Sequence, residues 1–230
     1  MAPTAKPVRP FTVDPDVMAR IRPMRAVDVD RVAELHHAAM GNSLWAKLGI
    51  PFLRELYRGL VNNDRFLGFV YEEDGRVVGF IAGSIDASKM MRTTFRKCWF
   101  LLGPASLPNA LKPSVLRQLV TTARYFSQSD SVLAEAVAAE SLFCSFEPGL
   151  RGKRISGHIN KVLFDELLAR GTSKVKVTTE IDNEGANRQL TSWGFEDKGH
   201  FQFYGKDMVT YVLDLEASPR VEPVSRHPAV

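Results

Sequence analysis

The chain has 230 residues, of which 45% are hydrophobic and 24% charged, as in an ordinary globular protein. This composition excludes a disordered chain and a coiled coil. Lysine and arginine number 30 against 26 acidic residues, and the net charge of +4 suits a small anionic ligand but does not by itself indicate nucleic-acid binding.

The sequence carries two cysteines, Cys98 and Cys144, and no Cys or His cluster with metal-ligand spacing. We therefore expect no disulfide framework and no metal site. The longest strictly apolar run, Cys98–Leu102, is far shorter than the ~20 residues that a membrane span requires. The N-terminus has no apolar signal region, so we expect a cytoplasmic protein without membrane contact.

Proline-rich segments without hydrophobic periodicity stand at 1–16 and 217–230 and predict mobile tails around a single domain over 17–216. Asp74-Gly75 supplies the positive φ angles of a tight turn and predicts a β-hairpin. The expected elements of the first half are a strand over Val17–Arg25, a helix over Asp28–Met40, a helix from Pro51 to Val61, and hairpin strands over Phe66–Tyr71 and Arg76–Ile85.

Residues 86–130 are too many for a bare loop, and we interpret them as a helical insertion before the central strand. The second half alternates between strands and helices, and Gly171 and Gly194 predict helix ends. Its expected elements are a buried strand over Ala139–Phe146, a helix over Ile155–Arg170, a strand over Lys174–Thr179, a short helix over Ala186–Trp193, and strands over Phe201–Tyr204 and Met208–Leu215.

The turn G-L-R-G-K-R-I-S-G (149–157) lies between the buried strand and the long helix. Amides at a helix start lack helical partners, and the helix dipole is positive there. With Arg151, Lys153 and Arg154 they make a candidate site for a phosphate or pyrophosphate. The alternative is an ordinary turn with solvated basic side chains.

The stretch A-E-S-L-F-C-S-F-E-P-G-L-R-G-K-R-I-S (139–156) resembles the strand and loop signature of the GNAT acyltransferase superfamily, and N-E-G-A-N-R-Q-L-T-S-W-G-F-E (183–196) resembles its second motif. The two motifs stand in that family's order and spacing, and the resemblance covers about 21–215 apart from the insertion. It implies an α/β (α+β) fold with a mixed, mostly antiparallel sheet flanked by helices, and acetyl-CoA or another short acyl-CoA as co-substrate. The cofactor-binding residues that it implies are Cys144, Phe146, Arg151, Gly152, Lys153, Arg154, Ile155, Ser156, Gly157, Asn183 and Asn187.

Three positions depart from the family pattern. Arg154 and Ser156 replace small residues, which either blocks close backbone approach or adds a charge-assisted bond to phosphate, and we favour the second interpretation. Leu190 stands where many members have a tyrosine that protonates the leaving thiolate. Tyr204 could replace it, although the sequence does not place Tyr204 at the site. With a thiol pKa near ~8.5, CoA is a tolerable leaving group without this acid.

The amine acceptor needs a base, and Glu140 aligns with a glutamate often found at the start of the family's central strand. On an apolar strand its pKa is expected to be raised, whereas the alternative is a structural carboxylate paired with a lysine. Glu180 and Asp182 are the next candidates.

Four other features of the sequence have simpler structural interpretations. The pair His36-His37 is expected to place one ring inside and one outside the first helix, and His158 is expected on a solvated surface. Cys144 is expected as a small core residue rather than a nucleophile, and Trp45 could line the acceptor site.

The sequence thus predicts an acyl-CoA-dependent N-acyltransferase acting on a primary amine of a small molecule or protein, and we favour a small molecule. It leaves a monomer and a homodimer open. One alternative is a non-catalytic acyl-CoA-binding or interaction module of the same fold. Another is a protein that binds RNA or a membrane surface through the basic, aromatic segment Met90–Leu102.

Replacing Arg151 with glutamate tests the phosphate-binding loop. Arg151→Glu should weaken CoA binding at least about tenfold, because a cation beside the pyrophosphate becomes an anion. Calorimetric titration with CoA measures this, and an unchanged affinity would mean that the pyrophosphate binds elsewhere.

Overall fold

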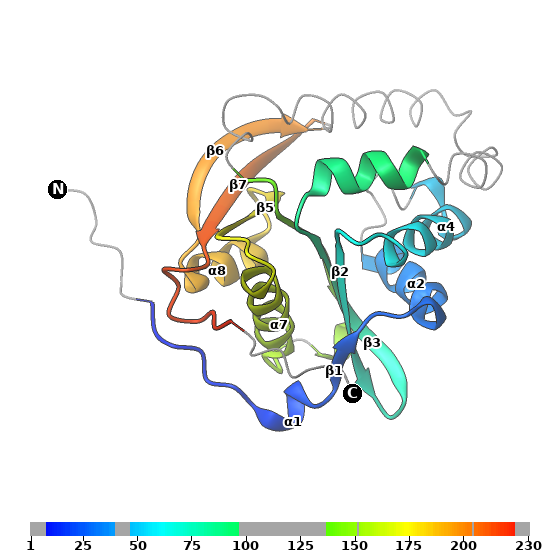
Figure 1. The fold of residues 1–230 in the computed structure, drawn as a ribbon, viewed down its shortest axis with the longest axis horizontal. Coiled ribbons are helices and arrows are strands. Elements are labelled where there is room, and N and C mark those ends of the chain that lie inside the picture. Colours follow the sequence, from blue (N-terminus) through cyan, green and yellow to red (C-terminus); the bar gives the residue numbers. More distant parts are fainter. Residues whose placement is uncertain (1–7, 40–46, 97–136, 151, 204, 224–230) are drawn as a thin grey trace.

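The computed structural model describes residues 8–39, 47–96, 137–150, 152–203 and 205–223. Seven strands form a sheet in the order β1-β2-β3-β4-β5-β7-β6, in which β4 and β5 are parallel and the other neighbours antiparallel. Helices α2 and α4 lie on one face, and α7 and α8 on the other (Figure 1). This mixed, helix-flanked sheet confirms the predicted fold class.

The elements follow the predicted order. The strands are β1 (Ile21–Pro23), β2 (Phe66–Glu73), β3 (Arg76–Ser84), β4 (Glu140–Phe146), β5 (Lys174–Glu180), β6 (Glu196–Phe203) and β7 (Lys206–Asp214). The helices described over their whole length are α1 (Pro15–Met18), α2 (Val29–Ala39), α4 (Ile50–Val61), α7 (Ile155–Ala169) and α8 (Glu184–Trp193), and residues 87–96 are also helical. Two 3-10 turns, η1 (Ala26–Asp28) and η2 (Pro148–Leu150), precede α2 and follow β4.

Local backbone signals produce the confirmed boundaries. Asp74 and Gly75 both have positive φ, of 51° and 75°, as the tight turn between β2 and β3 requires. Gly171 and Gly194 adopt positive φ where α7 and α8 end. Pro51 stands in the first turn of α4, where the missing amide costs nothing.

Two boundaries differ from the sequence prediction. The expected strand over Val17–Arg25 is reduced to β1, because Asp14 caps α1 directly before it and η1 follows. Strand β6 begins at Glu196, five residues earlier than predicted. The first residues of β6 are polar because it is the exposed last strand of the sheet. A search for alternating apolar residues therefore does not detect them.

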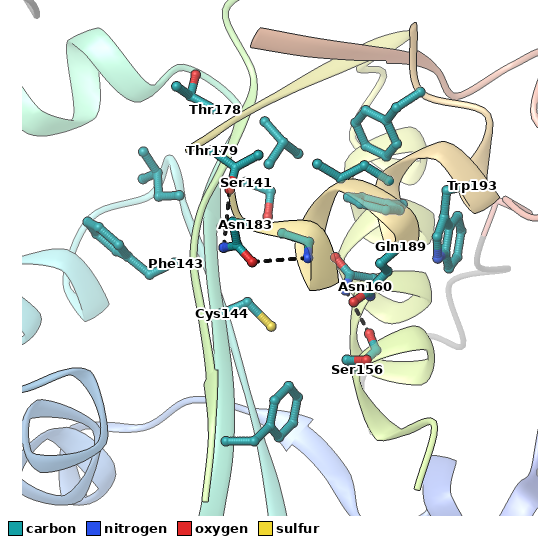
Figure 2. A pocket seen from close by; sticks show the side chains of 17 residues that line it. Ser141, Phe143, Cys144, Ser156, Asn160, Thr178, Thr179, Asn183, Gln189 and Trp193 are labelled. Carbon is teal, nitrogen blue, oxygen red and sulfur yellow. Dashed lines mark hydrogen bonds between the residues drawn. The ribbon is translucent and has the colours of Figure 1, made fainter. Parts of the chain in front are cut away.

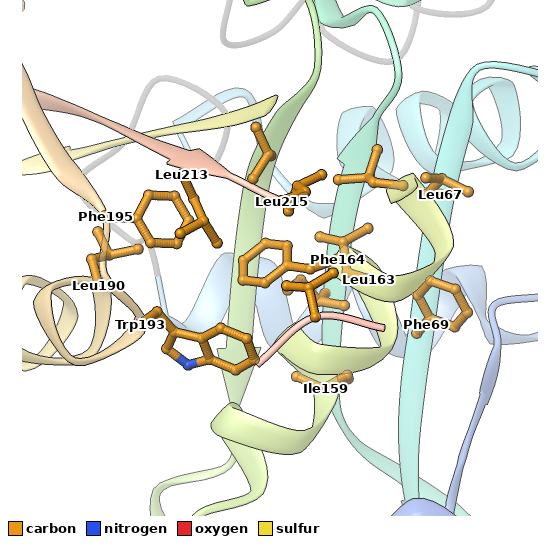
Figure 3. Close-up of a cluster of buried hydrophobic side chains, with 14 of the residues drawn as sticks. Leu67, Phe69, Ile159, Leu163, Phe164, Leu190, Trp193, Phe195, Leu213 and Leu215 are labelled. Atoms are coloured by element: carbon orange, nitrogen blue, oxygen red, sulfur yellow. The ribbon is translucent and has the colours of Figure 1, made fainter. Parts of the chain in front are cut away.

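The sheet separates two hydrophobic cores. Side chains from α2 and α4 pack against one face, around Leu53, Tyr57 and Phe80. The other core surrounds α7, where Leu163 and Phe164 are fully buried and Trp193 of α8 packs edge-on against Phe164 (Figure 3). Burial of this many large apolar side chains fixes α7 against the sheet.

Part of each predicted tail packs on the domain. In the N-terminal segment, Phe11 stacks on Trp193 with ring centroids 5.5 Å apart, and the Asp14 amide donates to His158. In the C-terminal segment, the buried Lys161 of α7 donates to the carbonyl of Arg220 at 3.0 Å. Residues 8–16 and 217–223 therefore belong to the folded unit.

The insertion is described only at its start, where residues 87–96 are helical and bury Met90 and Met91. The rest of 86–130, including residues 97–102 of the segment Met90–Leu102, lies outside the described residues, as do Trp45 and Tyr204. No helix within the described ranges has the length and apolarity to cross a membrane.

Candidate functional site

The site forms where β4 and β5 separate. These parallel strands pair at two positions, Glu140 with Lys176 and Ser141 with Val177, and then diverge. A register shift opposite β3 falls between Ser141 and Phe143, so β4 carries one extra residue, Leu142, at this point. Beyond the two pairs, the edge of β4 that faces β5 has no partner strand among the described residues.

A cavity of about 300 Å³ opens between the separated strands, α7 and α8 (Figure 2). It is lined by Ser141, Leu142, Phe143, Cys144, Phe146, Ser156, Asn160, Phe164, Val177, Thr178, Thr179, Asn183, Ala186, Gln189, Leu190, Trp193 and Phe195. Hydroxyl and amide groups are set among apolar side chains, as in sites for small organic ligands.

Beyond the extra residue Leu142, successive side chains of β4 point in opposite directions. Figure 2 shows Cys144 directed toward α7 and Phe143 directed away from it. The Phe146 ring lies over Gly79 of β3, where any Cβ would collide with it. This glycine allows a phenylalanine at the end of β4 to reach the cavity wall.

Cys144 corrects the expectation of a core residue. Its side chain is exposed, and it lines the cavity. Desolvation by the cavity walls raises the pKa of its thiol, so the thiol stays protonated near neutral pH. Because the thiolate is the nucleophilic form, Cys144 is unsuited to covalent catalysis.

One stripe of α7 supplies the wall opposite β4. Ser156, Asn160 and Phe164 follow one another at four-residue intervals and share a face of the helix. The Asn160 amide donates to the Ser156 carbonyl at 2.7 Å, one turn earlier. This repeat was present in the sequence and would have identified Asn160 as a lining residue.

The loop before α7 has an unusual backbone. Arg154 is the N-cap residue with φ 58° and ψ 10°, the left-handed conformation that glycine adopts most easily, and Gly152 has φ 83°. The Arg154 side chain is exposed and does not line the cavity. The amides of Gly152 and Ser156 donate to no backbone carbonyl among the described residues, and Ser156 stands in the first turn of α7, at the positive end of the helix dipole.

The predicted cofactor-binding residues divide into two groups. Cys144, Phe146, Ser156 and Asn183 come together around the cavity. Gly152, Lys153, Arg154, Ile155 and Gly157 gather instead at the start of α7, and Arg151 lies outside the described residues.

Within the second group, three side-chain positions are already engaged. Lys153 forms a long, exposed ion pair of 3.9 Å with Glu73 at the hairpin. Ile155 is buried in the α7 core, and Phe11 packs against Gly157. The loop backbone and the exposed side chains of Lys153 and Arg154 thus remain accessible to a ligand.

Both asparagines organise the end of β5. Asn183 is the N-cap of α8, and its side chain accepts from the Ala186 amide and donates to the Thr179 hydroxyl. Asn187 donates to the carbonyl of Ile181 at 2.8 Å and does not line the cavity.

Glu140 lies on the opposite face from the cavity, at the first of the two residue pairs that join β4 to β5. It is buried, and its Oε2 is 3.7 Å from the Lys176 ammonium. Burial raises the pKa of the Glu140 carboxyl, while Lys176 acts in the opposite direction. The other carboxylate candidates are more exposed: Glu180 pairs with Lys206, and Asp182 lies on the surface.

Two of the four described histidines, His36 and His158, are buried. His36 is buried beside Tyr57, with Nδ1 2.8 Å from the tyrosine hydroxyl, and burial lowers the pKa of its ring to about 3. His37 is half-buried, so the expected division of the pair is only partly seen. The expectation of a solvated His158 was wrong, because the N-terminal segment covers its ring and the Asp14 amide donates to it.

No protein-family model matches the sequence, and no curated protein matches it. The structure, in contrast, is similar to solved N-acetyltransferases. One from Staphylococcus aureus Mu50 gives a TM-score of 0.56 at 18% identity, with 84% of this chain and 99% of that one covered. The chain has the fold of the GNAT-type N-acetyltransferases.

Two further structures share this GNAT fold. The ribosomal-protein-S18-alanine N-acetyltransferase from Escherichia coli gives a TM-score of 0.52 at 12% identity, covering 90% of this chain and 97% of that one. Mutant forms of the spermidine/spermine N-acetyltransferase SpeG from Vibrio cholerae give 0.50 at 13%, covering 84% and 94%. At these identities the likeness establishes the fold alone.

Replacing Arg154 with glycine separates backbone strain from ligand binding. Arg154→Gly should raise the free energy of unfolding by about 0.5–1 kcal/mol, because the left-handed conformation is costly for arginine. If the guanidinium contacts phosphate, CoA affinity should fall about tenfold in the same variant. Thermal unfolding and calorimetry measure the two effects.

The matched control is Asp74→Gly, at the other described non-glycine residue with positive φ. It should stabilise the protein without changing CoA affinity. A destabilised Arg154→Gly protein would contradict the strain argument.

Thr178 and Thr179 offer a second matched pair. The Thr178 hydroxyl is buried without a hydrogen-bond partner among the described residues, whereas Thr179 accepts from Asn183 at 3.4 Å. Thr178→Val should leave the free energy of unfolding unchanged or raise it by up to ~1 kcal/mol, and Thr179→Val should lower it by about 0.5–1.5 kcal/mol. Denaturant unfolding measures both free energies. A larger loss of stability in Thr178→Val than in Thr179→Val would contradict the hydrogen-bond assignment of the two hydroxyls.

Proposed function

We propose that this chain is an acyl-CoA-dependent N-acyltransferase that moves an acetyl or other short acyl group to a primary amine. The observation that carries the proposal is the cavity at the separation of β4 and β5, bounded by the start of α7. An unpaired strand edge can bind an extended, amide-containing ligand as an added strand. A helix N-terminus beside it binds phosphate.

The residues present fit an acyl-CoA. The cavity is at the small end of the ~300–1,000 Å³ range for ligand sites, which suits the narrow pantetheine arm rather than the nucleotide. Ser156, Asn160 and Gln189 would offer polar groups to the arm's amides. The amides of Gly152 and Ser156, with Lys153, Arg154 and Arg151, would hold the pyrophosphate.

Bound acyl-CoA would supply an activated thioester, and the chain's own groups would direct the amine to it. Backbone amides of β4 near Cys144 would hydrogen-bond the thioester oxygen as negative charge develops there. Fixing amine and thioester on a rigid strand supplies orientation. The C–N bond forms and the C–S bond breaks. Leu190 cannot protonate the departing sulfur, which leaves as a thiolate because its pKa is near ~8.5.

Glu140 would accept the proton that the amine loses, through a water molecule. An alkylamine with a pKa of ~10.4 is neutral in only about one molecule in 2,500 at pH 7, so a base is worth several kcal/mol. The acceptor would be a small-molecule or protein amine in the cytoplasm. Among the enzymes of the same fold, one is named for a protein acceptor, the alanine of ribosomal protein S18, and another for the small-molecule acceptors spermidine and spermine.

A thiol-release assay with acetyl-CoA tests the proposal. The panel should include spermidine, spermine, a peptide with N-terminal alanine and a lysine peptide. Release of CoA that depends on one of these amines, with a matching mass gain of the acceptor, supports an N-acetyltransferase. CoA binding by calorimetry without turnover on any amine would favour the non-catalytic module, which Leu190 makes the alternative.

Replacing Glu140 with glutamine tests the base. Glu140→Gln should lower kcat about 10²–10⁴-fold with little change in the KM for acetyl-CoA, because proton transfer is lost and the cavity is retained. The matched variant is Glu180→Gln, at the exposed carboxylate that ends β5. Wild-type turnover by Glu140→Gln from pH 6 to 9 would remove this residue from the mechanism.

A further inference from the structure

The ion pair between Glu140 and Lys176 has an unusual location. Its two members face each other across the first of the two residue pairs that join β4 to β5. The ammonium is 3.7 Å from Oε2, and both side chains are about 8% exposed. The second pair, Ser141 with Val177, follows directly, and beyond it the strands separate to form the cavity.

The sheet places this ion pair on the face away from the cavity. Residues that are paired across a sheet point to the same side, and Ser141 and Val177, one residue further on, belong to the cavity face. Glu140 is therefore within one residue of the cavity but is separated from it by the backbone of β4. An amine approaching from this face would meet the carboxylate before the thioester.

The other neighbours of Glu140 bring no compensating charge among the described residues. Its partner on β3 is Ser84, and the partner of Lys176 on β7 is Val212. In the helical residues 87–96, Met90 and Met91 face inward, Lys89 pairs with Asp86 at 2.9 Å, and Arg92 and Arg96 are exposed. Lys176 is thus the described cation that acts on Glu140.

A buried carboxylate without a partner favours its neutral form, which cannot accept a proton. We propose that Lys176 is a positioning residue of the reaction: its ammonium keeps the Glu140 carboxylate ionised and fixed at the point where β4 and β5 separate. This inference rests on the proposed function, in which Glu140 is the base. Lys176 itself contacts no substrate in this proposal. Its role is to keep the Glu140 base ionised at neutral pH.

The sign of the effect follows from the charges. Without the ammonium, burial alone acts on Glu140, and its pKa rises further. A base with a raised pKa becomes protonated at a higher pH. The acid limb of the pH–activity profile therefore moves to higher pH. An opposite charge at this distance shifts a carboxyl pKa by about 1–3 units.

The test compares pH profiles of kcat for Lys176→Met, Lys176→Arg and Lys174→Met with one amine. Lys176→Met should move the acid limb up by about 1–3 pH units, so that activity lost at pH 7 returns near pH 9. Lys176→Arg should keep the wild-type limb because it keeps the charge. Lys174, an exposed lysine of the same strand, is the matched control, and its variant should be unchanged.

A second readout does not require turnover. The side-chain carboxyl carbon of Glu140, assigned by its absence in Glu140→Gln, is titrated by ¹³C NMR in wild type and Lys176→Met. A higher carboxyl pKa in Lys176→Met supports the inference even if no amine is acetylated, in which case the proposed function alone fails. An unmoved carboxyl pKa, or an equal loss of kcat at every pH, overturns it.

Folding of the variant is controlled by a double replacement. Lys176→Met leaves a buried charge without its partner, which is destabilising. Glu140→Gln with Lys176→Met removes both charges and should recover thermal stability. If Lys176→Met does not fold, Lys176→Gln is titrated in the same way, and an unmoved Glu140 pKa there contradicts the proposal.

Discussion

The site depends on the brevity of the parallel pairing between β4 and β5. Two residue pairs join these strands, and the sheet then opens. If the pairing continued to Phe146, side chains of the two strands would close the space that the cavity occupies. Instead the β4 edge stays unpaired, α7 and α8 form the walls, and the amides of the α7 N-terminus lie at one end. The cavity is therefore a property of the sheet and not of any one loop.

Both faces of the sheet contribute at this separation. The α7 face provides the cavity, with Cys144, Asn160 and Gln189 among its lining residues. The opposite face carries the buried Glu140–Lys176 ion pair. A gap in the sheet is the shortest path between the two faces, so groups from separate cores can act on one reacting centre without a loop that reaches around the sheet.

Much of the fold could be predicted because its signals are local. The Asp74-Gly75 turn, Pro51 and Gly194 each fix a boundary through their own backbone preferences, and the alternation of apolar residues fixes the faces. The cavity wall on α7 is similarly encoded in the four-residue spacing of Ser156 and Asn160. Such features require only the neighbouring sequence.

The errors have a common physical cause, which is contact between residues distant in the chain. His158 is buried because Phe11 and Asp14, about 150 residues earlier, cover it. Cys144 is exposed because β5 separates from β4 before this residue and leaves the cavity open beside it. The Lys176 partner of Glu140 likewise follows from strand register, which single-sequence periodicity does not give.

The position of the two terminal segments bears on how the connectivity of this domain could be changed by circular permutation. They meet beside α7 and α8, where the Arg220 guanidinium donates to the carbonyl of Arg9 at 2.8 Å and lies over the Trp193 ring of α8. A few added residues could join positions 9 and 220 covalently, and the exposed hairpin tip at Gly75 offers a place to open the chain instead. The same closeness would let the whole unit be inserted as a module into a surface loop of another protein.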